Sequence, residues 1–232
     1  MNWLVWNIRG MGKGEKTISL KSLVNKYKIN FLGLIETKHR RTMKYRIKRF
    51  WGSDDFEFCE SFASETYGGG IVTIWDPQSF SVSNTHIGER WIILEGCLKM
   101  LNFECCVGII YGPNTRLERV DFFETMQSLI ISINKPTLIM GDFNVVRFAG
   151  ERVGSFRCDL SSRIFDSWIH VLGFIELPLH GLKSPGEEMI RKVSLIEGFA
   201  VMSGLGGSQT QSLLGLKGVD RTIILFYLWV MT

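Results

Sequence analysis

An acid and an amide two positions apart follow a short apolar run in the middle of the chain. The segment Gly141-Asp142-Phe143-Asn144 comes directly after residues 136–140, Pro-Thr-Leu-Ile-Met. Side chains alternate along an extended backbone, so Asp142 and Asn144 are expected to point the same way. A carboxylate and an amide aimed together suit chemistry at a phosphodiester. The same residue types are common turn formers, so a turn is the better interpretation of this segment taken alone.

Three other apolar, strand-like runs also end in polar residues. Asn7 follows residues 3–6, Glu36 follows residues 31–35, and Tyr111 and Asn114 follow residues 107–110. Strand ends are places where a rigid scaffold presents functional groups. Each segment taken singly also fits a turn or a solvated strand end.

Taken together, these side chains suit a hard divalent cation beside a phosphate. Mg²⁺ takes oxygen ligands, usually one or two carboxylates with water and substrate phosphate. We therefore predict Glu36 and Asn7 as ligands of Mg²⁺ (or Mn²⁺). Asp142 would orient or deprotonate a water molecule, with Asn144 holding Asp142 or the phosphate in place.

The elements that must position these residues are mostly strands. Runs rich in β-branched and aromatic residues predict strands at Asn2–Ile8, Phe31–Glu36, Gly70–Trp75, Ser79–His86, Trp91–Leu98, Glu104–Tyr111 and Thr137–Met140. Helical spacing of apolar residues predicts helices at Lys16–Tyr27, Arg116–Ile133 and Leu160–Leu172. Strands mixed with a few helices indicate an α+β sandwich layered by helices.

Composition sets broad limits on the class of protein. A chain of 232 residues with 45% hydrophobic residues fits one domain with a real core. The net charge of +4 is compatible with a polyanionic partner. Five cysteines without a CxxC pair, and an N-terminus without a signal-peptide pattern, favour an intracellular protein, nuclear or cytoplasmic and not secreted. The apolar run at residues 223–231 is too short to span a membrane.

Four segments resemble the endonuclease/exonuclease/phosphatase (DNase I-like) family in residues, order and spacing. They are residues 6–10 (Trp-Asn-Ile-Arg-Gly), 34–37 (Leu-Ile-Glu-Thr), 111–114 (Tyr-Gly-Pro-Asn) and 141–144 (Gly-Asp-Phe-Asn). The segment Gly173-Phe174-Ile175-Glu176-Leu177-Pro178-Leu179-His180-Gly181 is typical of the endonuclease domain of non-LTR (LINE-type) retrotransposon polyproteins. The resemblance covers residues 1–183.

The resemblance implies a four-layer α/β/β/α sandwich and a metal-dependent phosphodiesterase. It implies Mg²⁺ on Glu36 with Asn7 nearby, Tyr111 against the scissile phosphate, and Asp142 with Asn144 handling the attacking water. The partner would be DNA, nicked so that its 3′-OH primes a reverse transcriptase domain of the parent polyprotein. Residues for DNA contact would be Arg9, Lys38, Arg40, Arg41 and Asn114.

The family pattern breaks after about residue 183. The family continues with an Asp-containing strand and ends in Ser-Asp-His, yet the last histidine here is His180 and the only aspartate after Asp166 is Asp220. We therefore expect a domain at residues 1–183 that lacks its C-terminal strands, followed by a divergent, poorly ordered tail at 184–232. A sandwich without its last strands would expose sheet edges and favour aggregation.

A shifted reading frame accounts for the tail. If Asp220–Phe226 is encoded as GAT CGG ACC ATA ATC CTA TTC, dropping the first two letters yields Ser-Asp-His-Asn-Pro-Ile. The same shift applied to Ser194–Gly204 restores an Asp-containing strand, and around Ser184 it restores the usual continuation of the preceding loop. One nucleotide lost near the codon of Ser184 would produce all three changes.

The sequence thus supports an endonuclease domain of a non-LTR retrotransposon that has become inactive. One alternative is a non-catalytic nucleic-acid-binding module of the same fold, for which the basic segment 38–49 would be the signature. Another is a cellular phosphodiesterase resembling the abasic-site nucleases. Salt-dependent DNA binding without Mg²⁺-dependent nicking would favour the binding module.

Overall fold

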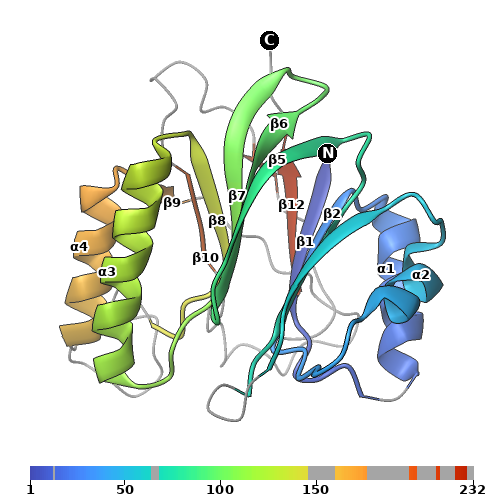
Figure 1. Cartoon of the computed structure of the whole chain (residues 1–232), viewed down its shortest axis with the longest axis horizontal. Helices are drawn as coiled ribbons and strands as arrows, with labels where there is room; N and C mark the ends of the chain where they lie inside the picture. Colours follow the sequence, from blue (N-terminus) through green and yellow to red (C-terminus); the bar gives the residue numbers. More distant parts are fainter. Residues whose placement is uncertain are drawn as a thin grey trace, which may run out of the picture.

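Two sheets packed face to face make up the centre of the molecule, with a pair of helices on each outer face (Figure 1). The computed structural model of the chain describes residues 1–12, 14–63, 68–145, 160–176, 199–202, 213–214 and 223–228. This arrangement confirms the expected four-layer α/β/β/α sandwich. None of the described helices combines the length and apolarity needed to cross a membrane.

The first sheet has six strands in the order β11-β12-β1-β2-β4-β3. Their bounds are β1 Asn2–Asn7, β2 Phe31–Ile35, β3 Glu57–Ser61, β4 Ile71–Trp75, β11 Leu213–Leu214 and β12 Ile223–Leu228. Two helices lie over its outer face, α1 (Glu15–Tyr27) and α2 (Lys44–Trp51).

The second sheet also has six strands, in the order β5-β6-β7-β8-β10-β9. Their bounds are β5 Phe80–Ile87, β6 Trp91–Leu98, β7 Phe103–Tyr111, β8 Thr137–Asp142, β9 Ile175–Glu176 and β10 Phe199–Met202. Its outer face is covered by α3 (Arg116–Ile133) and α4 (Leu160–Val171).

Apolar side chains fill the spaces between all four layers. In β1, Trp3 and Val5 face the second sheet, whereas Leu4 and Trp6 face α1 and α2. Both faces of this strand are buried, which explains its continuous apolar sequence. The clusters between the layers fix the two sheets against each other and so fix the relative positions of their strand ends.

Parallel pairing brings two pairs of functional strand ends together. In the first sheet β1 runs parallel to β2, with Asn7 opposite Ile35. In the second sheet β7 runs parallel to β8, with Tyr111 opposite Asp142. Parallel strands share one carboxyl end, so the polar residues that follow each pair lie at a common edge.

Besides the short strands β9 to β12 near the C-terminus, the structure contains β3 and α2, which the sequence patterns did not predict. Strand β3 is polar and partly exposed at the sheet edge, so it lacks an apolar run. From its sequence, the basic segment Lys44–Arg49 fits either a DNA contact or a solvated helix face. It forms a helix that buries Ile47, Phe50 and Trp51 against the core.

The tail contributes backbone to both sheets. Strand β12 pairs antiparallel with β1, and β10 pairs antiparallel with β8. The C-terminal strands that we expected to be missing are therefore present as backbone pairing within the described residues. The proposed domain boundary at residue 183 lies outside the described residues, and the frameshift remains a prediction about the coding DNA.

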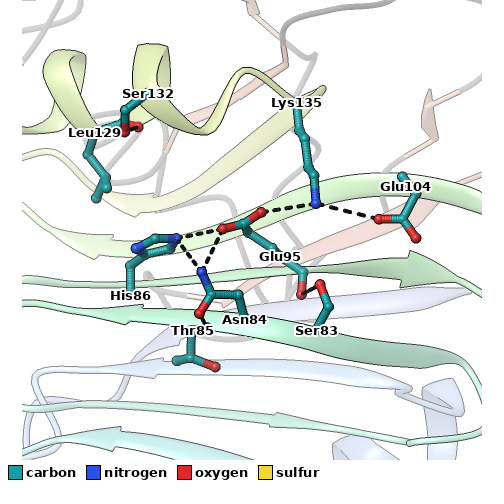
Figure 2. A network of polar contacts seen from close by, with 9 residues as sticks. All are labelled: Ser83, Asn84, Thr85, His86, Glu95, Glu104, Leu129, Ser132 and Lys135. Atoms are coloured by element: carbon teal, nitrogen blue, oxygen red, sulfur yellow. Dashed lines mark hydrogen bonds and ion pairs between the residues drawn. The ribbon is translucent and has the colours of Figure 1, made fainter.

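A polar network covers the outer face of β5 and β6 beside the end of α3 (Figure 2). The Glu95 carboxylate lies 2.7 Å from His86 Nε2 and 3.0 Å from Lys135 Nζ, and it accepts a 2.9 Å hydrogen bond from Asn84 Nδ2. Lys135 Nζ also lies 3.6 Å from Glu104 Oε2. These contacts lower the pKa of Glu95 to about 2, with the His86 hydrogen bond as the largest cause.

Candidate active site

Asn7 and Asp142 join the two sheets at the carboxyl ends of β1 and β8. Asn7 Nδ2 donates to Asp142 Oδ2 at 3.4 Å, although 135 positions separate them in sequence. The two side chains are only 5% and 7% exposed. Asn7 Oδ1 accepts from the Arg9 backbone N–H at 3.3 Å, which orients the amide. The contact places an amide and a carboxylate from opposite sheets at one point.

Asn144 reaches this point by a turn and not by strand alternation. Strand β8 ends at Asp142, and Asn144 has a left-handed backbone with φ of 53°. Its backbone N–H donates to Asp142 Oδ1 at 2.8 Å, and its Nδ2 donates to the Gly112 carbonyl at 2.6 Å. The prediction that Asp142 and Asn144 lie on one extended strand is therefore wrong, because the strand ends at Asp142 and a turn follows. Asn144 nevertheless contacts Asp142, as expected.

Glu36 and Tyr111 form the second contact between the sheets. Tyr111 Oη donates to Glu36 Oε2 at 3.5 Å. Burial raises the pKa of Tyr111, and the charges of Glu36 and Asp142 raise it further. The phenol therefore stays protonated at neutral pH and can donate to an oxygen anion. The other Glu36 oxygen, Oε1, lies 3.2 Å from Lys38 Nζ.

The backbone around the site is held in an uncommon conformation. Arg9, Glu36, Lys38 and Asn144 all have positive φ, between 47° and 55°. Each such residue costs about 1–3 kcal/mol and persists where the surroundings enforce it. Here the Glu36 carbonyl accepts from the Gly10 N–H at 2.6 Å, which ties the β2 loop to the β1 loop.

Two buried or partly buried cations support the loops, and the sequence patterns did not identify either. Lys16 in α1 donates to the Ile8 and Gly10 carbonyls at 2.6 and 2.7 Å. Arg119 in α3 is 7% exposed and donates to the Pro113 and Asn114 carbonyls at 2.9 Å each. Both donate from side chain to backbone, a contact for which the sequence carries no spacing signal.

The five residues expected to contact DNA are all exposed: Arg9, Lys38, Arg40, Arg41 and Asn114. They follow the ends of β1, β2 and β7, so they lie on the segments that leave the site-bearing edge of the sandwich. Two of these residues contact a candidate metal ligand directly: Lys38 through its ion pair with Glu36, and Arg9 through its backbone N–H to Asn7.

The donor set fits a Mg²⁺ ion that keeps several waters. Within the described part of the chain, no three His, Cys, Asp or Glu side chains gather in a way that could enclose a metal ion. Glu36 offers an 18% exposed carboxylate that accepts from Tyr111, and the same phenol interacts with the charge of Asp142, the partner of Asn7. A site with few carboxylates is what Mg²⁺ uses when a substrate phosphate completes its shell. The cation now paired with Glu36 is the Lys38 ammonium.

Comparison with known proteins finds the same fold. Residues 4–187 match the profile of the endonuclease/exonuclease/phosphatase family. No curated protein sequence matches the chain.

Solved structures resemble the chain at low sequence identity. The AP endonuclease of Leishmania major has a TM-score of 0.73 at 15% identity, over 97% of this chain and 86% of that one. An AP endonuclease from Archaeoglobus fulgidus has a TM-score of 0.72 at 10% identity, over 98% of both chains. The endonuclease domain of TRAS1, a telomere-specific non-LTR retrotransposon, has a TM-score of 0.65 at 13% identity, over 97% and 96%. At these identities the likeness shows the fold.

Proposed function

Since the chain belongs to the endonuclease/exonuclease/phosphatase family, we propose that it is the DNA-nicking endonuclease domain of a non-LTR retrotransposon. The observation that carries this proposal is the meeting of Asn7 with Asp142 and of Glu36 with Tyr111 across the two sheets. The retrotransposon assignment is supported by the family-typical segment 173–181 and by the similarity to the TRAS1 domain. Residues 177–181 of that segment lie outside the described residues.

The site residues divide the work of phosphodiester hydrolysis among them. Glu36 and Asn7 would hold Mg²⁺ (or Mn²⁺), which when bound polarises the phosphate and offsets its developing charge. Asp142 accepts the proton of the attacking water, and Asn144 fixes the Asp142 carboxylate through its backbone N–H. Tyr111 keeps its proton because its pKa is raised, and its hydroxyl donates a hydrogen bond to a phosphate oxygen.

We further propose that this chain is a weak or inactive form of that enzyme. The Ser-Asp-His ending of the family is absent from its sequence, so two groups that bracket the phosphate are missing. Loss of one electrostatic stabiliser of a transition state costs about 10²–10³ in rate. Loss of two therefore leaves little nicking, even where the remaining residues keep their places.

Supercoiled plasmid incubated with Mg²⁺ tests both proposals. The protein is compared with a version whose gene carries one nucleotide inserted near the codon of Ser184. We expect nicking by the frame-restored protein alone, lost on Glu36→Ala or Asp142→Ala. Equal nicking by both proteins would contradict the role given to the tail. Sequencing the coding DNA is a second test, since a Thr222 codon that does not end in C removes the proposed histidine.

A non-catalytic DNA-binding module is the second candidate function. The exposed cations Lys38, Arg40 and Arg41 favour it, because they can bind DNA phosphates even if the site has lost its catalytic activity. Affinity for DNA that falls with salt, in the absence of Mg²⁺-dependent nicking by either protein, would select this candidate. Preferential cleavage of DNA containing abasic sites would instead favour a cellular repair-type nuclease, and two of the similar structures are AP endonucleases.

A further inference from the structure

A buried histidine lies three positions beyond Glu36, between the end of β2 and strand β3. His39 is 8% exposed, and its Nδ1 lies 2.5 Å from Thr37 Oγ1. Its Nε2 lies 3.8 Å from Glu60 Oε1. Thr37, the residue directly after Glu36, is 1% exposed. None of these three side chains has a part in the chemistry described above.

The surroundings select one tautomer of the imidazole. Burial lowers the pKa of His39 in spite of the nearby Glu60 charge, which keeps the ring neutral at pH 7. Nε2 lies too far from the Glu60 carboxylate for a hydrogen bond and is buried without another hydrogen-bond partner in the described part of the chain, but the carboxylate charge favours a protonated Nε2 over a bare lone pair, so the Nε2–H tautomer is favoured. Nδ1 is then an acceptor, and the Thr37 hydroxyl donates to it. The hydroxyl is thereby fixed in one direction.

The histidine is itself anchored from several elements. Its carbonyl accepts from the Ala63 N–H at 3.0 Å, and its ring lies 5.2 Å from the Phe62 ring. Glu60 Oε1 accepts from the Met43 N–H at 2.5 Å, at the start of α2. The imidazole is therefore a fixed support for Thr37 and not a mobile surface group.

Thr37 is also fixed through its backbone, on the side opposite the β1 loop. Its N–H donates to the Gly70 carbonyl at 3.1 Å, and the Lys38 N–H donates to the Gly69 carbonyl at 2.7 Å. Gly70 has φ of +83°, and a Cβ there would lie 2.7 Å from Thr37 Oγ1 and 3.0 Å from His39 Nδ1. The glycine run before β4 thus leaves room for the Thr37–His39 contact.

We propose that His39 is a positioning residue for Glu36, acting through Thr37. Glu36 has a left-handed backbone, so its carboxylate direction depends on what holds the following residue. The His39–Thr37 hydrogen bond, with Glu60 behind it, fixes that residue and aims the carboxylate at the metal position. This inference rests on the metal-binding role proposed for Glu36. Outer partners of metal ligands typically change affinity by about 10–100-fold when removed.

Mn²⁺ affinity of the full chain, measured by calorimetry together with urea unfolding, tests this inference without any need for nicking. We expect His39→Ala and Thr37→Val each to weaken Mn²⁺ binding by about 10-fold. The double variant should bind Mn²⁺ no more weakly than the weaker of the two single variants, because both substitutions remove the same Thr37–His39 hydrogen bond. His39→Asn keeps an acceptor near the Nδ1 position and should stay within about 3-fold of wild type.

His86→Ala is the matched control, because His86 also pairs with a glutamate but lies in the outer network of Figure 2. We expect it to bind Mn²⁺ like wild type. Wild-type affinity in Thr37→Val and His39→Ala, with Glu36→Gln abolishing binding, would overturn the positioning role alone. Absence of Glu36-dependent Mn²⁺ binding in the wild type would overturn the proposed function as well. Should His39→Ala fail to fold, the near-isosteric Thr37→Val decides the question.

Discussion

Replacing Glu95 by glutamine tests how strongly the outer network of β5 and β6 stabilises the fold (Figure 2). The Glu95 side chain is 13% exposed and its pKa falls from 4.5 to about 2. A shift of this size corresponds to about 3 kcal/mol of differential interaction. Solvent and salt screen a network on the outer face of a sheet, which reduces the expected loss to about 1–2 kcal/mol.

The sign of the pH dependence follows from the lowered pKa. A carboxyl group with a depressed folded-state pKa contributes stability that is present above pH 4.5 and lost as pH falls toward 2. The difference in free energy of unfolding between wild type and Glu95→Gln should therefore be full at pH 6–7. It should lose more than half its size by about pH 3, and it should shrink in about 1 M salt.

Urea unfolding followed by tryptophan fluorescence at a series of pH values measures this difference. Glu104→Gln is the matched control, since Glu104 contacts the same Lys135 at 3.6 Å but its side chain is 63% exposed. We expect that control to lose less than about 0.5 kcal/mol. Equal losses for the two variants, or a Glu95→Gln difference that does not vary with pH, would refute the reasoning.

Three further outcomes are expected. Arg119→Met removes two 2.9 Å hydrogen bonds to loop carbonyls and should cost about 3 kcal/mol in urea unfolding; an unchanged midpoint would contradict that support. Gly112→Ala places a Cβ 2.3 Å from the Phe143 carbonyl oxygen and should cost about 2 kcal/mol or more of stability in thermal unfolding. An unchanged unfolding temperature would show that the backbone can make room for the methyl group. Burial raises the pKa of Cys105 to about 12 and of Cys106 to about 11, so mass spectrometry after iodoacetamide treatment at pH 8 should find both unlabelled until the protein unfolds, whereas native labelling would show that they are accessible.

Much of the sandwich could be predicted because several of its strands are buried on both faces. Continuous apolar runs such as those of β1, β2 and β4 leave few alternatives to a buried strand. The bounds of α3 were also predicted, at Arg116–Ile133, and Thr115 caps the helix by accepting from the Glu118 N–H. Where the apolar positions in the sequence are also the buried positions in the structure, the strand or helix can be predicted from the sequence.

The elements that were missed have patterns decided by tertiary contacts. Strand β3 forms at the sheet edge because β4 pairs with it, and its own residues are largely polar. Helix α2 carries four basic residues among eight, which mask the apolar face made by Ile47, Phe50 and Trp51. The basic residues obscured the helical spacing of the apolar ones, and the packing of those apolar side chains against the core stabilises the helix.

Asn7, Glu36, Tyr111 and Asp142 could be singled out because each follows or ends an apolar strand, and parallel strands have their carboxyl ends at one edge of a sheet. The sequence could not reveal which of these residues would touch. That depends on how the two sheets face each other, which is set by side-chain packing over the whole core. His39 was likewise unexplained by sequence, because its partner Glu60 belongs to the strand that the patterns missed.

A crystal of the protein soaked in Mn²⁺ tests the central claim most directly, through the anomalous signal of the metal. We expect one strong site in which the Glu36 carboxylate binds Mn²⁺ directly, beside Asn7, with the Lys38 ammonium displaced from Glu36. Metal bound elsewhere at saturating Mn²⁺, with the Glu36–Lys38 pair intact, would contradict it.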